Sequence, residues 1–306
     1  MKKIIFFGTS DFAVPALKAL AQDERFEIIG IVTQPDRPVG RHAILTPPAV
    51  KKSAQGIGRI FQPEKLKDES FKAWISEAGP SCDAFVIVSY GKILPQWLLD
   101  LPKKGIVNVH GSLLPRWRGA SPIQAAIASG DDLSGVTIML IDAEMDHGPI
   151  LATADEKILP EDTGGSLHDR LAELGGRILP DILADYLDNK IQPQEQDHEK
   201  ATYCKILTRD DGKLDFEKPA DGLERLIRAF QPWPGTWMEI EGKRIKILSA
   251  RLGVSNENKT PGTRFINEGL PCLACADGTA LEITRLQLEG KSAMTGEDYL
   301  RGKNVW

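Results

Sequence analysis

The chain has 306 residues, of which 42% are hydrophobic and 26% are charged, and its formal net charge is −5. This length exceeds the usual size of a single hydrophobic core, so two domains are expected, and the composition is that of a folded protein rather than a disordered one. The acidic net charge argues against a protein that coats nucleic acid by bulk attraction, although it leaves room for a local basic surface.

Apolar runs in the sequence are short. The run at residues 4–7 is too short for a signal peptide, and no stretch approaches the roughly 20 apolar residues that a membrane-spanning helix needs. Cys82 and Cys204 are isolated, while Cys272 and Cys275 form one CxxC without the second pair of a zinc ribbon. We therefore expect a soluble cytoplasmic protein without a metal site.

The N-terminal part alternates apolar runs with amphipathic stretches, which is typical of βα units and a mostly parallel sheet. The predicted strands are residues 3–7, 27–33, 84–89, 106–109, 136–141 and 149–153. The predicted helices are residues 12–21, 121–129 and 166–189. Ser10 or Asp11 can cap the first helix. The pattern predicts an α/β, Rossmann-like domain over residues 1–189, with helices on both faces of the sheet.

Residues 190–208 are polar and irregular, as expected for a linker. Beyond them we predict one helix, residues 222–230, and then short alternating runs separated by Gly, Asn and Pro. The predicted strands of this part are residues 237–241, 244–250, 272–276 and 280–288. This pattern predicts a smaller, OB-like β-barrel domain over residues 209–306.

Gly8, Thr9, Ser10 and Asp11 follow the first strand, where a dinucleotide-binding protein carries GxGxxG. The second and third glycines, which let a pyrophosphate approach the helix N-terminus, are missing. The fold is therefore expected without a bound nicotinamide dinucleotide.

Asn108 and His110 end the fourth strand of the predicted sheet. Because they are two residues apart, they share one face, at the carboxyl edge where open α/β sheets bind ligands. A lone histidine there is most often structural, but the neighbouring amide and the turn at residues 111–115 favour a functional site. Asp146 lies on the loop between the next two strands, which a parallel sheet can bring close to His110. An amide, an imidazole and a carboxylate together can serve acyl transfer.

The motif NVHGSLLPRWRG, followed downstream by MDHGPIL, resembles the formyltransferases that use 10-formyltetrahydrofolate. By this resemblance Asn108, His110 and Asp146 are the catalytic residues, and no metal is required. The resemblance also implies that the folate binds against the turn formed by Ser112, Leu113, Leu114 and Pro115.

Three segments, TQPDRPVGR, VSYGKILP and IRAFQPWPGTW, resemble the branch of the family that acts on methionyl-tRNA. The resemblance extends over almost the whole chain and implies formyl transfer to the α-amino group of initiator methionyl-tRNA. It also implies that Arg41 contacts tRNA, although residues 42–44 depart from the family pattern. The charged residues Lys243, Arg244, Lys246 and Arg251 could be a tRNA contact or a solvated face. A monomer is expected.

Other activities fit the sequence less well. A formyltransferase acting on a purine precursor would lack the C-terminal extension, and one acting on an amino sugar is disfavoured by TQPDRP and PWPGTW. A nicotinamide-dependent dehydrogenase is disfavoured by the missing glycines. A non-catalytic tRNA-binding module is disfavoured by the complete set of Asn108, His110 and Asp146.

Overall fold

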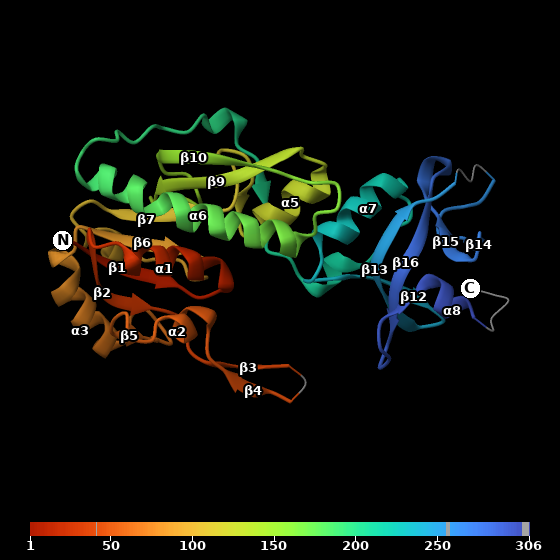
Figure 1. Ribbon diagram of the computed structural model, residues 1–306, viewed down its shortest axis with the longest axis horizontal. Helices are drawn as coiled ribbons and strands as arrows, with labels where there is room; N and C mark the ends of the chain where they lie inside the picture. Colours follow the sequence, from red (N-terminus) through yellow and green to blue (C-terminus); the bar gives the residue numbers. More distant parts are fainter. Residues whose placement is uncertain (41, 255–257, 302–305) are drawn as a thin grey trace. The chain divides into compact units, whose positions relative to one another are not determined.

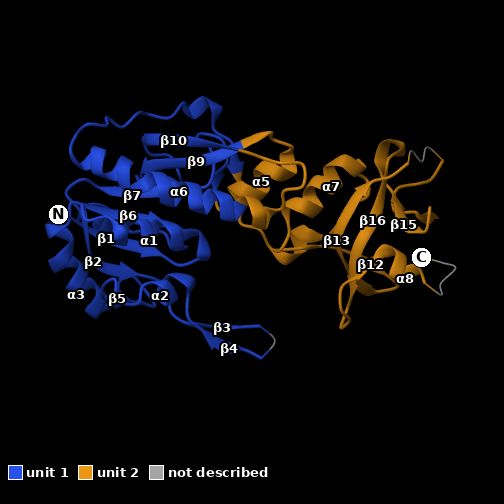
Figure 2. Cartoon of the chain, viewed as in Figure 1, with its two compact units in different colours: residues 1–119, 134–156, 168–203 blue, residues 120–133, 157–167, 204–306 orange. Residues whose placement is uncertain are grey.

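The computed structural model describes residues 1–40, 42–254, 258–301 and 306 (Figure 1). They form two compact units (Figure 2). Unit 1 comprises Met1–Gly119, Ser134–Glu156 and His168–Tyr203. Unit 2 comprises Ala120–Leu133, Lys157–Leu167 and Cys204–Trp306. Each unit therefore contains segments that are distant in sequence.

Unit 1 is built on a seven-stranded sheet of order β10-β9-β7-β6-β1-β2-β5. Its strands are β1 (Lys2–Gly8), β2 (Phe26–Val32), β5 (Ile60–Phe61), β6 (Ala84–Val88), β7 (Ile106–His110), β9 (Leu133–Leu140) and β10 (Ile150–Lys157). The pairs β1/β2, β1/β6, β2/β5 and β6/β7 are parallel, whereas β7 and β9 are antiparallel. The expectation of a mostly parallel sheet is confirmed, and β9 is the antiparallel neighbour of β7.

Helices cover both faces of this sheet, as predicted. The helix α6 (Gly164–Leu187) packs so closely on one face that a Cβ atom added at Gly175 would lie 2.8 Å from Val109 Cγ1. At the next residue, Gly176, an added Cβ would lie 2.8 Å from Pro15 in α1 (Val14–Gln22), so α1 lies beside α6. The opposite face carries α3 (Glu69–Ala78) and α4 (Gln96–Leu99), which join one apolar cluster with Ile5, Phe85 and Ile106.

The start of the first helix differs from the prediction. The helix begins with a 3-10 turn, η1 (Asp11–Ala13), and neither Ser10 nor Asp11 caps it through its side chain. The Ser10 hydroxyl instead donates to Ser89 Oγ at 2.6 Å, which ties the end of β1 to the end of β6. A serine hydroxyl can cap a helix or bond elsewhere, and here it bonds to Ser89 at the end of the neighbouring strand.

Short elements that local periodicity does not reveal occur in residues 34–83 and near the site. They are β3 (Arg37–Val39), β4 (Ile44–Thr46), α2 (Ala49–Ser53), η2 (Gly79–Ser81), β8 (Arg118–Gly119) and β11 (Tyr203–Cys204). The strands β3 and β4 form a separate antiparallel hairpin, and β8 pairs with β11. Strands of two or three residues are too short to show a period of two.

Residues 194–203, here named the strap, run along unit 1 and form ordered hydrogen bonds there. The backbone of Gln194 exchanges two hydrogen bonds with Ile150, at 2.7 and 2.9 Å. Thr202 N donates to Pro115 O at 3.2 Å, and Arg118 N donates to Thr202 O at 2.8 Å. The strap therefore lies beside the segment that follows β7, and it includes η3 (His198–Lys200).

Unit 2 contains a six-stranded antiparallel sheet with the main order β12-β13-β16-β15-β14 and β17 paired with β16. Its strands are β12 (Thr236–Ile240), β13 (Lys243–Leu252), β14 (Arg264–Asn267), β15 (Leu270–Ala274), β16 (Ala280–Leu288) and β17 (Met294–Thr295). Its helices and 3-10 turns are α5 (Pro122–Ser129), η4 (Arg209–Gly212), α7 (Ala220–Ala229), η5 (Ala276–Gly278) and α8 (Gly296–Leu300). The predicted small C-terminal β domain is confirmed.

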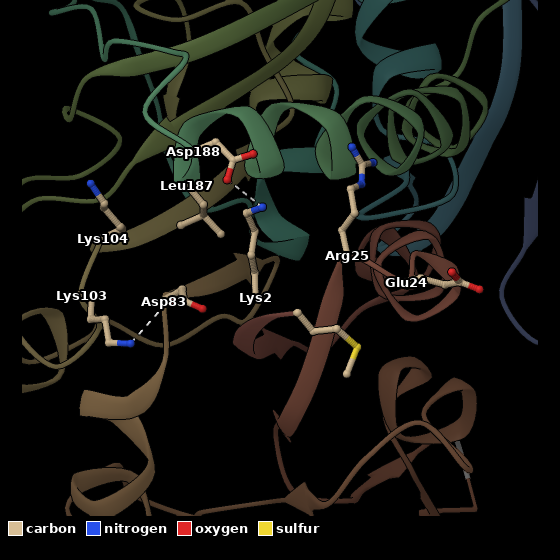
Figure 3. A pocket seen from close by; sticks show the side chains of 9 residues that line it. Lys2, Glu24, Arg25, Asp83, Lys103, Lys104, Leu187 and Asp188 are labelled. Carbon is tan, nitrogen blue, oxygen red and sulfur yellow. Dashed lines mark hydrogen bonds and ion pairs between the residues drawn. The ribbon is translucent and has the colours of Figure 1, made fainter.

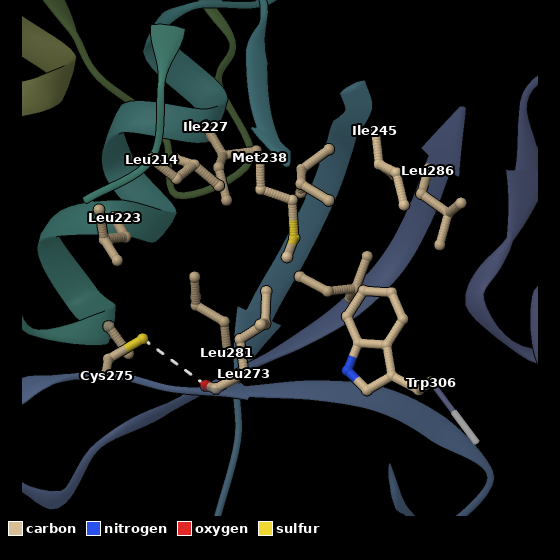
Figure 4. Close-up of a cluster of buried hydrophobic side chains, with 13 residues drawn as sticks. Leu214, Leu223, Ile227, Met238, Ile245, Leu273, Cys275, Leu281, Leu286 and Trp306 are labelled. Carbon is tan, nitrogen blue, oxygen red and sulfur yellow. Dashed lines mark hydrogen bonds between the residues drawn. The ribbon is translucent and has the colours of Figure 1, made fainter. Parts of the chain in front are cut away.

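One face of this sheet packs on α7, which contributes Leu223 and Ile227 to an apolar core closed by Trp306 (Figure 4). Cys275 lies in the same core, and burial raises the pKa of its thiol to about 11. The thiol of Cys272 is also free, with a pKa raised to about 11 by burial. Both cysteines of the CxxC are therefore packed as neutral thiols.

Candidate active site

Asn108 and His110 lie on one face of β7, as their spacing predicts. Val109, between them, points to α6, whereas Ile106 belongs to the apolar cluster on the α3 and α4 side. Because side chains alternate along a strand, Asn108 and His110 share the side of Ile106. His110 is only 6% exposed, whereas Asn108 is half-buried. Among the described residues, the Asn108 side chain has no hydrogen-bond partner, so its amide is available to a ligand.

Asp146 reaches the same place by a route that differs from the one expected of a parallel sheet. Since β9 is antiparallel to β7, its carboxyl end pairs with Val107, and Ile141 N donates to Ile106 O, at the far end of β7 from His110. The loop after β9 then returns on the α3 and α4 side of the sheet, where Ile141 packs against the apolar cluster. Asp146 Oδ1 comes to 3.6 Å from His110 Nδ1.

Two hydrogen bonds determine how this pair can act. His110 Nε2 lies 3.0 Å from Trp117 O. A carbonyl only accepts, so Nε2 carries a hydrogen, and Nδ1 is the nitrogen that faces Asp146. The other carboxylate oxygen, Asp146 Oδ2, accepts from Gly119 N at 2.8 Å. The 3.6 Å gap between Nδ1 and Oδ1 is too long for a hydrogen bond, so the two atoms face each other without one.

The turn after β7 is held by hydrogen bonds of Ser112 and of Thr137 from β9. Ser112 is buried, and its hydroxyl donates to Arg116 O at 2.6 Å. Thr137 Oγ1, from β9, donates to Ser112 O at 2.6 Å and accepts from Leu114 N at 3.0 Å. Leu114 is also buried, whereas Leu113 and Pro115 are half-buried. The predicted folate-binding residues therefore comprise two that shape the turn and two that retain exposed surface.

Two further loops meet at the carboxyl ends of the parallel strands. A cleft of about 460 Å³ lies there, lined by Thr9 and Ser10 after β1, by parts of residues 34–48, and by residues 89–91 after β6. In the loop after β6, Ile93 is 90% exposed, although Lys92 Nζ anchors the loop by donating to Pro63 O and Glu64 O at 2.8 Å each. Burial lowers the pKa of Lys92. An exposed apolar side chain on an anchored loop is suited to contact a flat ligand.

A second cleft of about 460 Å³ lies at the amino ends of the strands (Figure 3). Four of its charged side chains are paired with one another, since Lys2 lies 2.9 Å from Asp188 and Lys103 lies 3.3 Å from Asp83. Ligands of open α/β sheets bind at the opposite edge. The second cleft is therefore not the candidate site.

The basic residues predicted to contact tRNA have different surroundings. Arg41 lies outside the described residues. On β13, Lys243, Arg244 and Lys246 are exposed, and the Arg244 guanidinium stacks 3.8 Å from the Trp237 ring centroid. Arg251 instead donates through Nε to the buried Glu282 at 2.7 Å. All four side chains are exposed, but Arg251 is ion-paired at 2.7 Å, whereas Arg244 lies 3.9 Å from its acidic neighbour Asp210.

Neither a metal cluster nor a membrane-spanning helix is found within the described part of the chain. No group of three or more His, Cys, Asp and Glu side chains among those residues could hold a metal ion. In the same residues, every helix is too short or too polar to cross a bilayer.

Comparison with known proteins identifies the family. Residues 2–183 match the family described as formyl transferase, and residues 206–304 match its C-terminal domain. The chain belongs to the formyl transferase family. The expected resemblance to methionyl-tRNA formyltransferases is confirmed as well. This formyl transferase is 42% identical over 305 residues to the methionyl-tRNA formyltransferase of Acidobacterium capsulatum. The alignment covers 99% of this chain and 97% of the relative. It is 44% identical to the methionyl-tRNA formyltransferase of Pseudomonas entomophila, in an alignment that covers 98% of this chain and 96% of that relative.

Solved structures share the fold of this formyl transferase. One is a sugar 3N-formyl transferase with dTDP and 5-N-formyl-THF, with a TM-score of 0.68, 19% identity, and coverage of 95% of this chain and 99% of the other. Another is the N-formyltransferase of Helicobacter canadensis in complex with folinic acid and dTDP-3-aminofucose, with a TM-score of 0.66, 18% identity, and coverage of 92% and 99%. At such low identity, these matches show the fold alone.

The sequence predicted no role for three residues near Asp146 in this formyl transferase: Arg118, Gly119 and Gln196. Arg118 and Gly119 belong to the motif NVHGSLLPRWRG, but nothing local showed that Gly119 donates to Asp146 or that Arg118 donates to Gln196. Gln196 lies in the segment predicted to be a linker, where it is one of several glutamines in a polar run. Only the tertiary contacts identify it.

Proposed function

We propose that this chain transfers the formyl group of 10-formyltetrahydrofolate to the α-amino group of methionine on initiator tRNA. The product is N-formylmethionyl-tRNA for translation initiation. The observation that carries the proposal is 42–44% identity, over nearly the whole length, to proteins named methionyl-tRNA formyltransferase. The chain is an enzyme, a one-carbon transferase.

In the proposed mechanism, the lone pair of the amine attacks the formyl carbon and the carbonyl electrons move to oxygen. The amide of Asn108 has no protein partner among the described residues and donates to this oxyanion. The His110 and Asp146 pair accepts the proton that the amine loses, through the open contact between Nδ1 and Oδ1. Collapse of the intermediate breaks the bond to N10 of the folate, which leaves as tetrahydrofolate after protonation.

The folate is proposed to bind between the turn after β7 and the loop after β6. Leu113 and Pro115 supply half-buried apolar surface, Ser112 and Leu114 keep the turn in shape, and Ile93 provides an exposed apolar wall. A flat ring needs such walls and few polar contacts. The folate acts as a formyl-donating cosubstrate, and the proposed reaction needs no metal.

The tRNA is proposed to contact the basic surface of β13, made of Lys243, Arg244 and Lys246. Trp237 supports it, because the ring carries the Arg244 guanidinium at 3.8 Å and lies opposite Lys246 in the strand pair. Arg41 is retained as a proposed tRNA contact from the family resemblance. We further propose that the enzyme is a cytoplasmic monomer.

The decisive experiment combines the purified protein with 10-formyltetrahydrofolate and methionine-charged initiator tRNA. N-formylmethionine should be released when the aminoacyl ester is hydrolysed, and uncharged tRNA should give none because it has no amine acceptor. A nucleotide-linked amino sugar serves as the competing acceptor. Formylation of the sugar without formylation of the charged tRNA would replace this proposal by a sugar formyltransferase.

A further inference from the structure

A buried polar network lies behind the Asp146 loop, and none of its side chains takes part in the proposed reaction. Arg118 and Gln196 are 2% and 5% exposed. Arg118 donates to Gln196 Oε1 from Nε at 3.1 Å and from Nη2 at 2.7 Å. Burying a guanidinium and an amide is costly unless their hydrogen bonds are satisfied, so this pair is a fixed part of the fold.

The orientation of the Gln196 amide follows from its partners. A guanidinium can only donate, so the oxygen must face Arg118 and the NH₂ group must face the other way. There Nε2 donates to Asp146 O at 2.9 Å and to Gly148 O at 2.8 Å. Both amide hydrogens therefore hold the backbone of the loop that carries the carboxylate.

This loop needs such support because Asp146 has φ of +50°, in the left-handed region. That conformation is costly for a non-glycine residue, which keeps it only where its surroundings impose it. Gln196 holds the Asp146 carbonyl, while Gly119 N, next to Arg118 in β8, holds the carboxylate at 2.8 Å. Main chain and side chain of Asp146 are thus held by a single assembly of β8 and the strap.

The same assembly also supports the loop from its other side. Arg118 Nη2 lies 2.8 Å from His198 Nδ1, which accepts because guanidinium only donates. The His198 ring stacks on His147, with centroids 4.0 Å apart and planes 1° apart. His147 Nδ1 in turn lies 2.7 Å from Asp142 Oδ2. The loop residues on both sides of Asp146 are therefore tied to the strap.

We infer that Gln196 is a positioning residue for formyl transfer: it sets the backbone at Asp146 so that the carboxylate faces His110 Nδ1. The inference rests on the proposed function, since it concerns the same carboxylate. A small displacement of a reacting group can cost about a hundredfold in rate. In this proposal Gln196 acts by holding the Asp146 loop, through Asp146 O and Gly148 O, and not by contacting a substrate.

The test compares Gln196→Met with Gln194→Met in the full chain. Methionine matches glutamine in size but cannot donate to the two carbonyls. Gln194 is an exposed glutamine in the same strap, and its backbone bonds to Ile150 survive substitution. We expect kcat of Gln196→Met to fall roughly tenfold to a hundredfold, with KM for folate and for charged tRNA within about twofold of wild type. Gln194→Met should match wild type.

A double-mutant cycle separates positioning from general stability. In an Asp146→Asn background, Gln196→Met should cause little further loss of kcat, because groups that act as a unit are not additive. Gln196→Asn keeps the amide on a side chain one methylene shorter, and it should fold and show the same pattern with a smaller loss. Additive losses, or normal kcat in both Gln196 variants, would overturn the inference. Absence of transfer by the wild type would instead refute the proposed function.

Discussion

At the scale of single residues, the site depends on an aspartate in a conformation that few residues adopt. Asp146 has φ of +50°, and Asp and Asn tolerate this region better than other non-glycine residues. Asn is therefore the substitution that removes the negative charge while retaining the backbone. Ala would remove the charge and also introduce backbone strain, so the two changes separate chemistry from conformation.

We expect Asn108→Ala, His110→Ala and Asp146→Asn each to lower kcat at least about a hundredfold, as when a stabilising interaction with the transition state is removed. Single-turnover formylation of charged initiator tRNA would measure this decrease. The three proteins should remain folded by circular dichroism. Near-normal turnover of Asp146→Asn would remove this carboxylate from the mechanism. Asp146→Ala should in addition lower the free energy of unfolding by about 1 kcal/mol, from strain in the left-handed region.

At the scale of elements, the strand β7, which carries the proposed catalytic residues Asn108 and His110, is backed by the closely packed helix α6. Gly175 and Gly176 allow this approach, the first against Val109 between Asn108 and His110, and the second against the backbone of Pro15. Glycine usually weakens a helix by about 1 kcal/mol relative to alanine. In α6 the close packing of strand, helix and neighbouring helix offsets that cost.

Gly176→Ala should therefore destabilise the protein despite the better helix propensity of alanine. The new Cβ would lie 2.8 Å from backbone and side-chain atoms of Pro15, which must shift, and overpacking of this kind costs about 1–3 kcal/mol. Gly222→Ala in α7 is the matched control, because the nearest atom to its added Cβ is the end of the Arg225 side chain at 3.9 Å. It should raise the free energy of unfolding by up to about 1 kcal/mol. Urea denaturation of both variants measures the difference, and equal effects would contradict the packing argument.

The strand β13 carries the proposed tRNA surface, and salt dependence tests it. Combined substitution of Lys243, Arg244 and Lys246 by alanine should weaken tRNA binding. It should also flatten the slope of log affinity against log salt, by roughly 0.7–0.9 for each phosphate that the protein no longer neutralises. Arg41→Ala should do the same on a smaller scale. Folate affinity should stay unchanged, because the proposed folate contacts are largely apolar and lie outside β13.

The control for this strand removes three exposed charges elsewhere in unit 2. Its substitutions are Lys259→Ala, Arg264→Ala and Arg301→Ala. The net charge then changes equally, so any difference reports position rather than total charge. Filter binding of charged initiator tRNA at several salt concentrations gives both slopes. Identical slopes for the two triple variants would show that β13 does not face tRNA.

At the scale of the whole molecule, the proposed folate contacts and the proposed catalytic residues lie within unit 1. The chain path is nevertheless interleaved, because α5, which lies between β8 and β9 in sequence, packs with α7 in unit 2. Removing the C-terminal part would therefore take away a packing partner of α5, whose buried residues include Ile123 and Ile127.

A fragment of residues 1–205 should consequently bind the folate but melt at a lower temperature than the full chain. The site residues proposed for folate are all present, whereas α5 would expose apolar surface at a cost of roughly 25 cal/mol per Å². Calorimetric titration with a stable formyl-folate analogue and a thermal melt measure the two properties. A folded fragment with no folate affinity would mean that the folate site extends beyond residue 205.

Sequence alone determined the features that depend on local pattern. Alternation of apolar runs predicted most of the longer strands and helices, although not α3, and a period of two placed Asn108 and His110 on one face. The motifs predicted the family, because several specific segments occur in one chain and in order. The missing glycines after β1 likewise follow from the sequence alone.

Only the tertiary structure decided how Asp146 reaches His110 and what holds it there. The direction of β9 is not encoded in its own pattern, since parallel and antiparallel neighbours can have the same apolar residues. Gln196 lies 50 positions from Asp146 in an aperiodic polar segment, and its hydrogen bonds arise only when the strap folds back beside β8. Local pattern reports which side chains share a face, whereas the meeting of distant polar groups depends on the path of the whole chain.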